Sequence, residues 1–268
     1  MESISAPTTV LYLRPLAAAG RTFTGMAEHA GQLWFLLANS TRAVLTLQVS
    51  LHSVMQQVYI MGVQSIPIVL VTAVLAGIVT SQQGGYQFQG NIPLYILGSV
   101  VVSSVILELG PVLTAIVLVG RVGARITAEI GTMQVSEQIE AFHAVGRDPI
   151  AILAAPRILA GIIVVPILVG VADVVGIFSG MVSAELTVGL GPESFLYGAR
   201  LFWHSWDLFY SLLKAVTFGF AIPLIAIHMG FRTGGGSAGV GRTTTASVMF
   251  MTLTVLILDA LFPPLLLQ

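Results

Sequence analysis

Four charged residues stand inside long apolar stretches of this sequence: Glu108, Asp173, Lys214 and Asp259. If such a stretch crosses a membrane, each charge costs about 3 kcal/mol or more and marks a functional site by default. Carboxylates and a lysine at membrane depth could form buried ion pairs, line a polar notch or relay protons. We expect Lys214 to pair with Asp173 or Asp259, and we favour a structural role for these three residues over a proton relay.

Glu108 differs from the other three because it belongs to a motif that distorts helices, Leu-Glu-Leu-Gly-Pro at residues 107–111. Pro111 has no backbone N–H, so the carbonyl of Leu107 loses its helical partner and we expect the helix to bend there. A bend beside a carboxylate suits a polar notch in the wall of a cavity. The alternative is a structural hydrogen bond from Glu108 to a neighbouring helix.

Glycine, proline and charged residues concentrate between residues 106 and 157. Residues 128–145 have helical periodicity. The apolar face of this predicted helix carries Ile130, Met133, Ile139 and Phe142. The charged residues of the helix and of the segment after it are Glu129, Glu137, Glu140, Arg147 and Asp148. Gly146 should end the helix. Such a helix could be gripped and pushed by an ATPase subunit, or it could be a plain amphipathic connector.

The composition shows what must surround these residues. Of 268 residues, 56% are hydrophobic and only 9% are charged, and the mean hydropathy is +0.93. Soluble domains carry about 25% charged residues, so we predict an all-α, polytopic membrane protein. The net charge of −1 excludes a nucleic-acid-binding surface, and the absence of cysteine excludes thiolate metal sites. Five stretches can span a bilayer, approximately residues 58–81, 92–119, 157–183, 209–230 and 245–266.

The N-terminal segment, residues 1–57, differs from the transmembrane domain that we assign to residues 58–268. Its residues 22–50 have an apolar core too short to span a bilayer, which predicts an amphipathic helix in the membrane interface. A soluble amphipathic linker is the alternative. Nine of the eleven Lys and Arg residues fall in this segment or in the loops after the second and fourth spans. The positive-inside rule therefore places the N-terminus and the 120–156 loop in the cytoplasm and the C-terminus outside.

The run from Glu108 to Arg157, with Gly-Gly-Ser-Ala-Gly-Val-Gly-Arg at residues 235–242 and with Asp259, resembles the MlaE/YrbE permease family. Glu140-Ala141-Phe142 followed by Gly146 is also similar to the start of the EAA-type loop of ABC importer permeases. The resemblance implies an inner-membrane permease that works with MCE-domain lipid-binding proteins outside. It would be a homodimer, with a phospholipid cavity between the two copies.

The resemblance also implies roles for individual residues. The predicted 128–145 helix and the Arg147–Asp148 segment would contact cytoplasmic ABC ATPase subunits. Those subunits would bind ATP and magnesium, so we expect no cofactor, metal site or catalytic residue in this chain. To the lipid cavity we assign Glu108, Leu107, Pro111 and Tyr86. Some family members have a basic residue where Leu107 stands here, so an arginine–glutamate pair in the cavity wall is not carried over.

Two other functions and one further motif compete with this interpretation. A proton-coupled secondary transporter would use Asp173 or Asp259 as its carrier site. An intramembrane acyltransferase would need His143 and Asp148, which have a His-x4-Asp spacing. The residues from 236 to 243 are similar to a nucleotide-binding P-loop, but no strand precedes them and arginine replaces the lysine. We expect a compact cytoplasmic turn there instead, with threonines 243–245 capping the last span.

Overall fold

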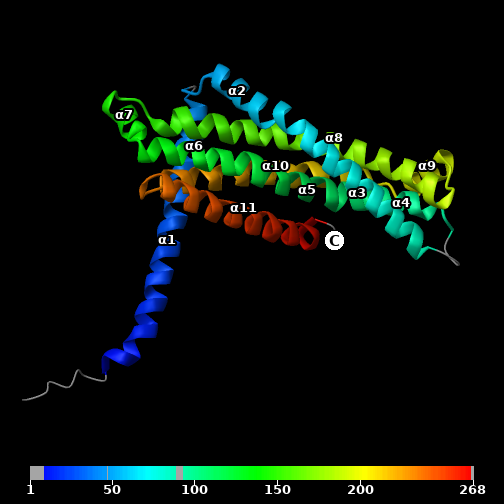
Figure 1. Ribbon diagram of the computed structural model, residues 1–268, viewed down its shortest axis with the longest axis horizontal. Coiled ribbons are helices and arrows are strands. Elements are labelled where there is room, and N and C mark those ends of the chain that lie inside the picture. Colours follow the sequence, from blue (N-terminus) through cyan, green and yellow to red (C-terminus); the bar gives the residue numbers. More distant parts are fainter. Residues whose placement is uncertain (1–8, 47, 89–92, 267–268) are drawn as a thin grey trace, which may run out of the picture.

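A computed structural model shows a bundle of long helices with one further helix crossing an end of the bundle (Figure 1). The structure describes residues 9–46, 48–88 and 93–266, with side chains from residue 27 onward. Within these ranges every regular element is a helix, as the composition predicts.

Five helical runs are long and apolar enough to cross a membrane, which confirms a multi-pass membrane protein with five spans. The first run consists of α2 (Leu51–Met61), η1 (Val63–Ser65) and α3 (Ile66–Gln87). The second consists of α4 (Ile96–Ser104), η2 (Val105–Leu109), α5 (Gly110–Leu118), η3 (Val119–Gly123) and α6 (Ala124–Val135). The third consists of η4 (Ile150–Ala154) and α8 (Ala155–Val188), and the last two are α10 (Ser205–Phe231) and α11 (Gly236–Leu266).

The helices are longer than the spans predicted from hydropathy. The shortest of the five runs has 27 residues and is therefore about 40 Å long, more than the ~30 Å hydrocarbon core of a bilayer. The second run continues to Val135, beyond the predicted end near residue 119, and α11 begins at Gly236, where we expected a turn. Thr244 is not a cap, since its hydroxyl donates to the carbonyl of Val240 one turn back in the helix (2.8 Å). The turn is made instead by Gly235 and Gly236, with φ of +80° and +70°.

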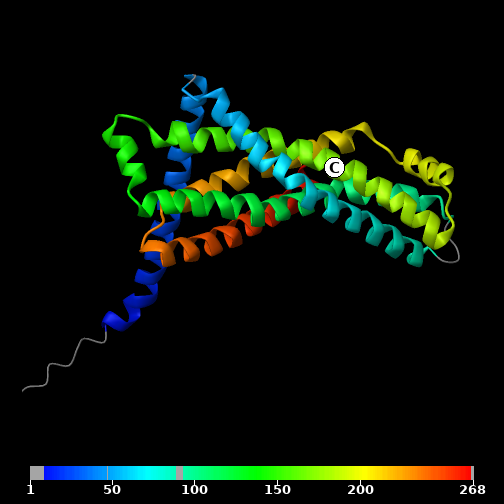
Figure 2. The same ribbon diagram turned by 45° about the horizontal axis from the view of Figure 1, so that its top comes forward.

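Helix α1 (Thr9–Leu45) crosses the bundle at one end and packs against η4, α8 and α10 (Figures 1 and 2). It begins well before the predicted residue 22; the side chains of Arg14 and Arg21 lie outside the described residues. Leu36 and Ala43 are buried against the bundle, whereas Trp34 and Phe35 on other faces are exposed. Helix α1 is thus two-sided, and its location in the membrane interface stays a prediction.

Small residues allow the spans to pack closely. A Cβ atom added to Gly77 of α3 would lie 2.0 Å from the carbonyl oxygen of Gly176 in α8. Gly161 of α8 and Gly219 of α10 face each other in the same way, with a Cβ at either one within 2.4 Å of the other's carbonyl oxygen. Only glycine fits at such contacts, so α8 is held between α3 and α10.

The two ends of the bundle carry different short helices. Helix α7 (Gln138–Ala144) lies at the end that α1 crosses, and α9 (Pro192–Leu201) lies at the other (Figures 1 and 2). These ends are called the α7 end and the α9 end below. The loop between α10 and α11 is also at the α7 end, so the arginines of the loops after the second and fourth spans gather there.

Candidate functional site

Three spans meet at the side chain of Lys214 in α10, which is fully buried. Its ammonium group lies 2.6 Å from Oε2 of Glu108 in η2 and also forms an ion pair with Asp259 in α11. It donates a third hydrogen bond to the carbonyl oxygen of Leu107, at 3.1 Å. One cation therefore joins the second, fourth and fifth spans and faces two carboxylates.

The backbone around Glu108 explains how this contact arises. Residues 105–109 form a π-helical turn, closed by the N–H of Gly110 bonding to the carbonyl of Val105. Pro111 cannot donate to the carbonyl of Leu107, so that oxygen is free to accept the hydrogen bond from Lys214. The predicted distortion is therefore present as a wide turn within a continuous helical run. π-Turns of this kind are frequent at functional sites.

Asp173 is the predicted partner that Lys214 does not use. It is buried in α8, and the hydroxyl of Ser211 donates to its Oδ2 at 3.3 Å. Its Oδ1 has no hydrogen-bond partner in the described part of the chain. That oxygen packs against Gly110, where a Cβ would lie 1.7 Å away. Of the two predicted pairings, the one with Asp259 is confirmed, and the contact with Glu108 was not anticipated.

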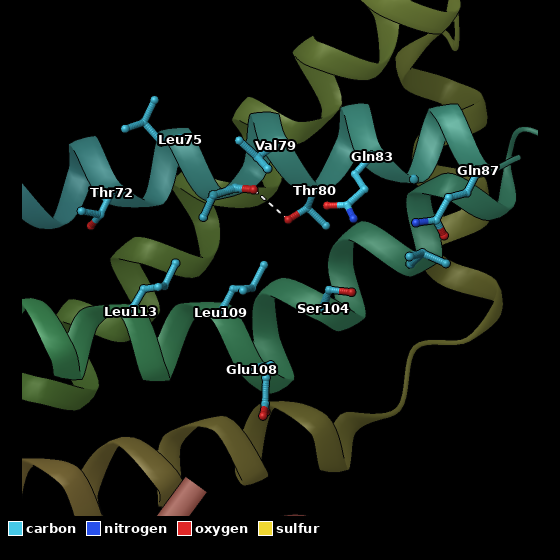
Figure 3. A pocket seen from close by; sticks show the side chains of 13 residues that line it. Thr72, Leu75, Val79, Thr80, Gln83, Gln87, Ser104, Glu108, Leu109 and Leu113 are labelled. Atoms are coloured by element: carbon cyan, nitrogen blue, oxygen red, sulfur yellow. Dashed lines mark hydrogen bonds between the residues drawn. The ribbon is translucent and has the colours of Figure 1, made fainter. Parts of the chain in front are cut away.

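A groove of about 710 Å³ opens between α3 and the run from α4 to α5 (Figure 3). Its lining is mostly apolar, with a row of polar side chains on α3. These are Thr72, Thr80, Gln83 and Gln87. The hydroxyl of Thr80 donates to the carbonyl of Ala76 in its own helix, at 2.7 Å (Figure 3). The amides of Gln83 and Gln87 on α3, with the hydroxyl of Ser104 on the opposite wall, therefore supply uncharged polar groups toward the α9 end of the groove.

Glu108 lines this groove at its edge, and its side chain points away from α3 (Figure 3). The side chain is 49% exposed although one oxygen contacts Lys214, so the carboxylate joins the groove to the ion cluster. The other residues assigned to the cavity do not line the groove. Leu107 contributes its carbonyl to Lys214, Pro111 is buried, and Tyr86 is exposed on α3.

Sequence reasoning missed the α3 wall, although the sequence contains a signal for it. Thr72, Thr80, Gln83 and Gln87 are separated by eight, three and four residues. At 3.6 residues per turn this spacing places all four on one helical face. A polar stripe on an otherwise apolar span would have predicted a lined groove there.

A second cluster of charged side chains joins α6 to α8 near the α7 end. Arg157 of α8 is buried; it donates to Oε2 of Glu129 in α6 at 2.9 Å and to the carbonyl of Leu153 at 2.7 Å. Arg125 lies 3.6 Å from the other oxygen of Glu129. Glu129, expected to contact an ATPase, is thus engaged by two arginines of its own chain.

The predicted helix over residues 128–145 is two helices, because α6 ends at Val135 and α7 begins at Gln138. Glu137 between them is left-handed, with φ of +58°. The apolar face is as predicted: Ile130 and Ile139 are buried, and Met133 and Phe142 pack on the same core. Gly146, with φ of +71°, follows the end of α7 as expected.

The remaining residues assigned to ATPase coupling surround α7. Glu137, Glu140, Arg147 and Asp148 are all exposed. Asp148 also has a local role, since its Oδ1 accepts a hydrogen bond from the N–H of Ile150 at the start of η4 (2.9 Å). Helix α7 is therefore a charged tip between two membrane-spanning runs.

Fold and site together define a helical multi-pass membrane protein. It has an ion cluster within its spans, a groove between two of the spans, and a short helix, α7, with charged residues around it at one end of the bundle. The family model Permease MlaE matches residues 54–264. The chain therefore belongs to the MlaE permease family, and several curated relatives are named probable ABC transporter permease proteins.

Three relatives illustrate the similarity. A probable ABC transporter permease protein of Rickettsia typhi is 36% identical over 81% of this chain and 83% of its own length. One from Synechocystis is 36% identical over 86% of this chain and 91% of its own. The chloroplastic protein TRIGALACTOSYLDIACYLGLYCEROL 1 of Arabidopsis thaliana is 31% identical over 81% of this chain and 62% of its own. This chain is thus a transport subunit and not an enzyme, and an acyltransferase role for His143 and Asp148 is set aside.

Proposed function

We propose that this permease moves phospholipid, or a related lipid, between the inner membrane and the outer envelope, driven by a partner ATPase. The observation that carries the proposal is the groove between α3 and the α4–α5 run, which is largely apolar and has a carboxylate at its edge. From Thr72 to Gln87 the groove follows fifteen residues of α3, or about 22 Å. That length and lining suit acyl chains, with glutamine amides near a headgroup.

The proposed assembly contains two copies of this chain, two cytoplasmic ATPase subunits that hold ATP and magnesium, and an MCE-domain protein outside. Helix α11 buries few of its residues within the chain, so its exposed apolar face is available to a second copy as well as to lipid. The arginines at the α7 end support an orientation with that end and the N-terminus in the cytoplasm and the C-terminus outside. The name of the Arabidopsis relative contains that of a glycerolipid, which fits a lipid substrate.

Helix α7 is the proposed contact for the ATPase. It connects α6, which is continuous with the span that carries Glu108, to η4 and α8. Movement of α7 would therefore reach the second span, which lines the groove and carries Glu108, and the third span, whose helix α8 packs against α3 and α10. Glu140 on α7 and the exposed charges that flank the helix supply a surface for a charged partner; the flanking residues are Glu137, Arg147 and Asp148.

Replacing Glu140 by lysine tests the coupling proposal. The exposed side chain has no ion pair in the described part of the chain, so Glu140→Lys should leave insertion and stability unchanged while abolishing ATP-driven lipid transport in reconstituted complexes. Glu193→Lys, an exposed glutamate on α9 at the other end, is the matched control and should transport normally. Normal transport by Glu140→Lys would refute the coupling role.

A second candidate function is proton-coupled secondary transport, favoured by the burial of Asp173 without a cationic partner in the described residues. The purified chain in liposomes separates the two functions. A secondary transporter would move lipid there in response to a proton gradient, whereas the ABC permease requires the ATPase and ATP.

A further inference from the structure

Two arginines on one face of the second helical run stand next to α2. Arg121 in η3 and Arg125 in α6 are four residues apart, one helical turn. With Gln57 of α2 and Glu129 of α6 they border a small hollow of about 20 Å³. The hollow lies toward the α7 end, away from the groove beside Glu108.

The charges around this hollow do not balance. In the described part of the chain, Arg121 has no ion-pair partner. Arg125 lies 3.6 Å from Glu129, whose other oxygen is bound more closely by Arg157, at 2.9 Å. Arg125 and Arg157 thus share the one carboxylate of Glu129, and Arg121 has none, so these three guanidinium groups and one carboxylate sum to a net charge of +2. This excess positive charge beside the hollow can bind an anion.

The position of the arginines along the helix indicates where that anion comes from. The run begins at Ile96, so the residues up to Gly120 cover about 37 Å, enough to cross the ~30 Å hydrocarbon core. With the hydrocarbon core beginning near Ile96, this length places Arg121 at the level of the lipid headgroups. Leu51, Met55 and Tyr59 on the adjacent α2 are exposed apolar or aromatic side chains, which is typical of a lipid-facing flank.

We propose that Arg121 and Arg125 bind the phosphate group of an anionic phospholipid in the leaflet at the α7 end. Guanidinium groups bind phosphate oxygens in pairs, and basic pockets between helices at this level bind lipid headgroups. The hollow is too small to contain a phosphate, so the phosphate lies at its mouth, where the side chain of Arg125 is 47% exposed. Gln57 offers a further amide donor, and the acyl chains lie along Met55 and Tyr59.

This site is separate from the transport groove. Arg121 follows Glu108 by thirteen residues in the same helical run, which is about 20 Å. The groove is bordered by α3 and α4–α5, whereas the arginine site is bordered by α2 and α6. The lipid bound here is therefore an annular lipid at the protein surface. Its binding requires neither an ATPase nor transport.

Native mass spectrometry of the full chain in detergent tests the proposal, with phosphatidylglycerol and phosphatidylcholine as probes. Wild-type protein should bind phosphatidylglycerol about tenfold more tightly, because its headgroup has a net negative charge, whereas the choline cation of phosphatidylcholine cancels the charge of its phosphate. Arg121→Gln/Arg125→Gln should lose this preference. Arg147→Gln/Arg242→Gln, which removes two exposed arginines at the same end, should keep it.

Two further measurements make the outcome decisive. Arg121→Lys/Arg125→Lys keeps the charge and should retain part of the preference for phosphatidylglycerol. If the glutamine variant has a lowered melting temperature, the lysine variant is compared with wild type instead. Equal binding of both lipids by wild type, or an unchanged preference in the glutamine variant, would overturn the proposal. Displacement of phosphatidylglycerol by millimolar inorganic phosphate would also overturn it, by assigning the site to free phosphate.

Discussion

Replacing Lys214 by methionine would remove the cation that holds three spans together, while keeping most of the side-chain volume. Removing one partner of a buried ion pair costs about 3–5 kcal/mol, because the other charge is left uncompensated. Asp259 would bear most of this cost, since it is only 16% exposed, whereas Glu108 at 49% exposure regains water. The hydrogen bond to Leu107 is also lost, which adds about 1 kcal/mol.

We therefore expect Lys214→Met to lower the free energy of unfolding by about 4 kcal/mol, or several hundredfold in the equilibrium constant. Lys214→Met/Asp259→Asn should recover most of the loss, because no uncompensated buried charge remains. Denaturant unfolding of the purified chain, followed by fluorescence of its three tryptophans, measures both values. Arg200→Met removes an exposed cation near the α9 end and should change nothing. A Lys214→Met protein as stable as wild type would refute the claim that this cluster joins the spans.

Two further changes test other contacts by the same unfolding measurement. Glu129→Arg should lower the free energy of unfolding by about 3 kcal/mol, because it leaves buried Arg157 facing a like charge. The exchange Glu129→Arg/Arg157→Glu should restore much of this loss. If the exchange restores none of it, Glu129 and Arg157 do not form a direct ion pair. Gly77→Leu should lower the free energy of unfolding by more than about 3 kcal/mol, because its Cβ would lie 2.0 Å from a carbonyl oxygen of α8. Gly170→Leu is the control and should be nearly neutral, since a Cβ at Gly170 would have no atom within 4 Å. Equal effects of the two substitutions would contradict the close packing of α3 on α8.

The spans could be predicted from the sequence, but most of their ends could not. Hydropathy identifies the part of a helix that lies in hydrocarbon, and it does not detect continuation into water. Helix α11 thus begins at Gly236 rather than near residue 245, although glycines and threonines fill the interval. The division between α6 and α7 was hidden for a different reason. The apolar spacing of Ile130, Met133, Ile139 and Phe142 continues across the left-handed Glu137 that separates the two helices.

The ionisable residues of the site could be recognised in the sequence, but their partners depended on tertiary structure. A charge within an apolar stretch is visible without coordinates, and so is the carbonyl that Pro111 frees. Whether Lys214 reaches Glu108, Asp173 or Asp259 depends on how α10 is rotated against its neighbours, which hydropathy does not encode. Asp173 is instead enclosed by Ser211 and Gly110.

Native mass spectrometry of the tagged chain, gently extracted from its host membrane, tests whether this chain is the permease of an ATP-driven lipid transporter. We expect a complex with two copies of the chain, two ATPase subunits, an MCE-domain protein and bound phospholipid. A lone chain or homodimer without an ATPase would contradict the coupling role of α7 and would favour a secondary transporter.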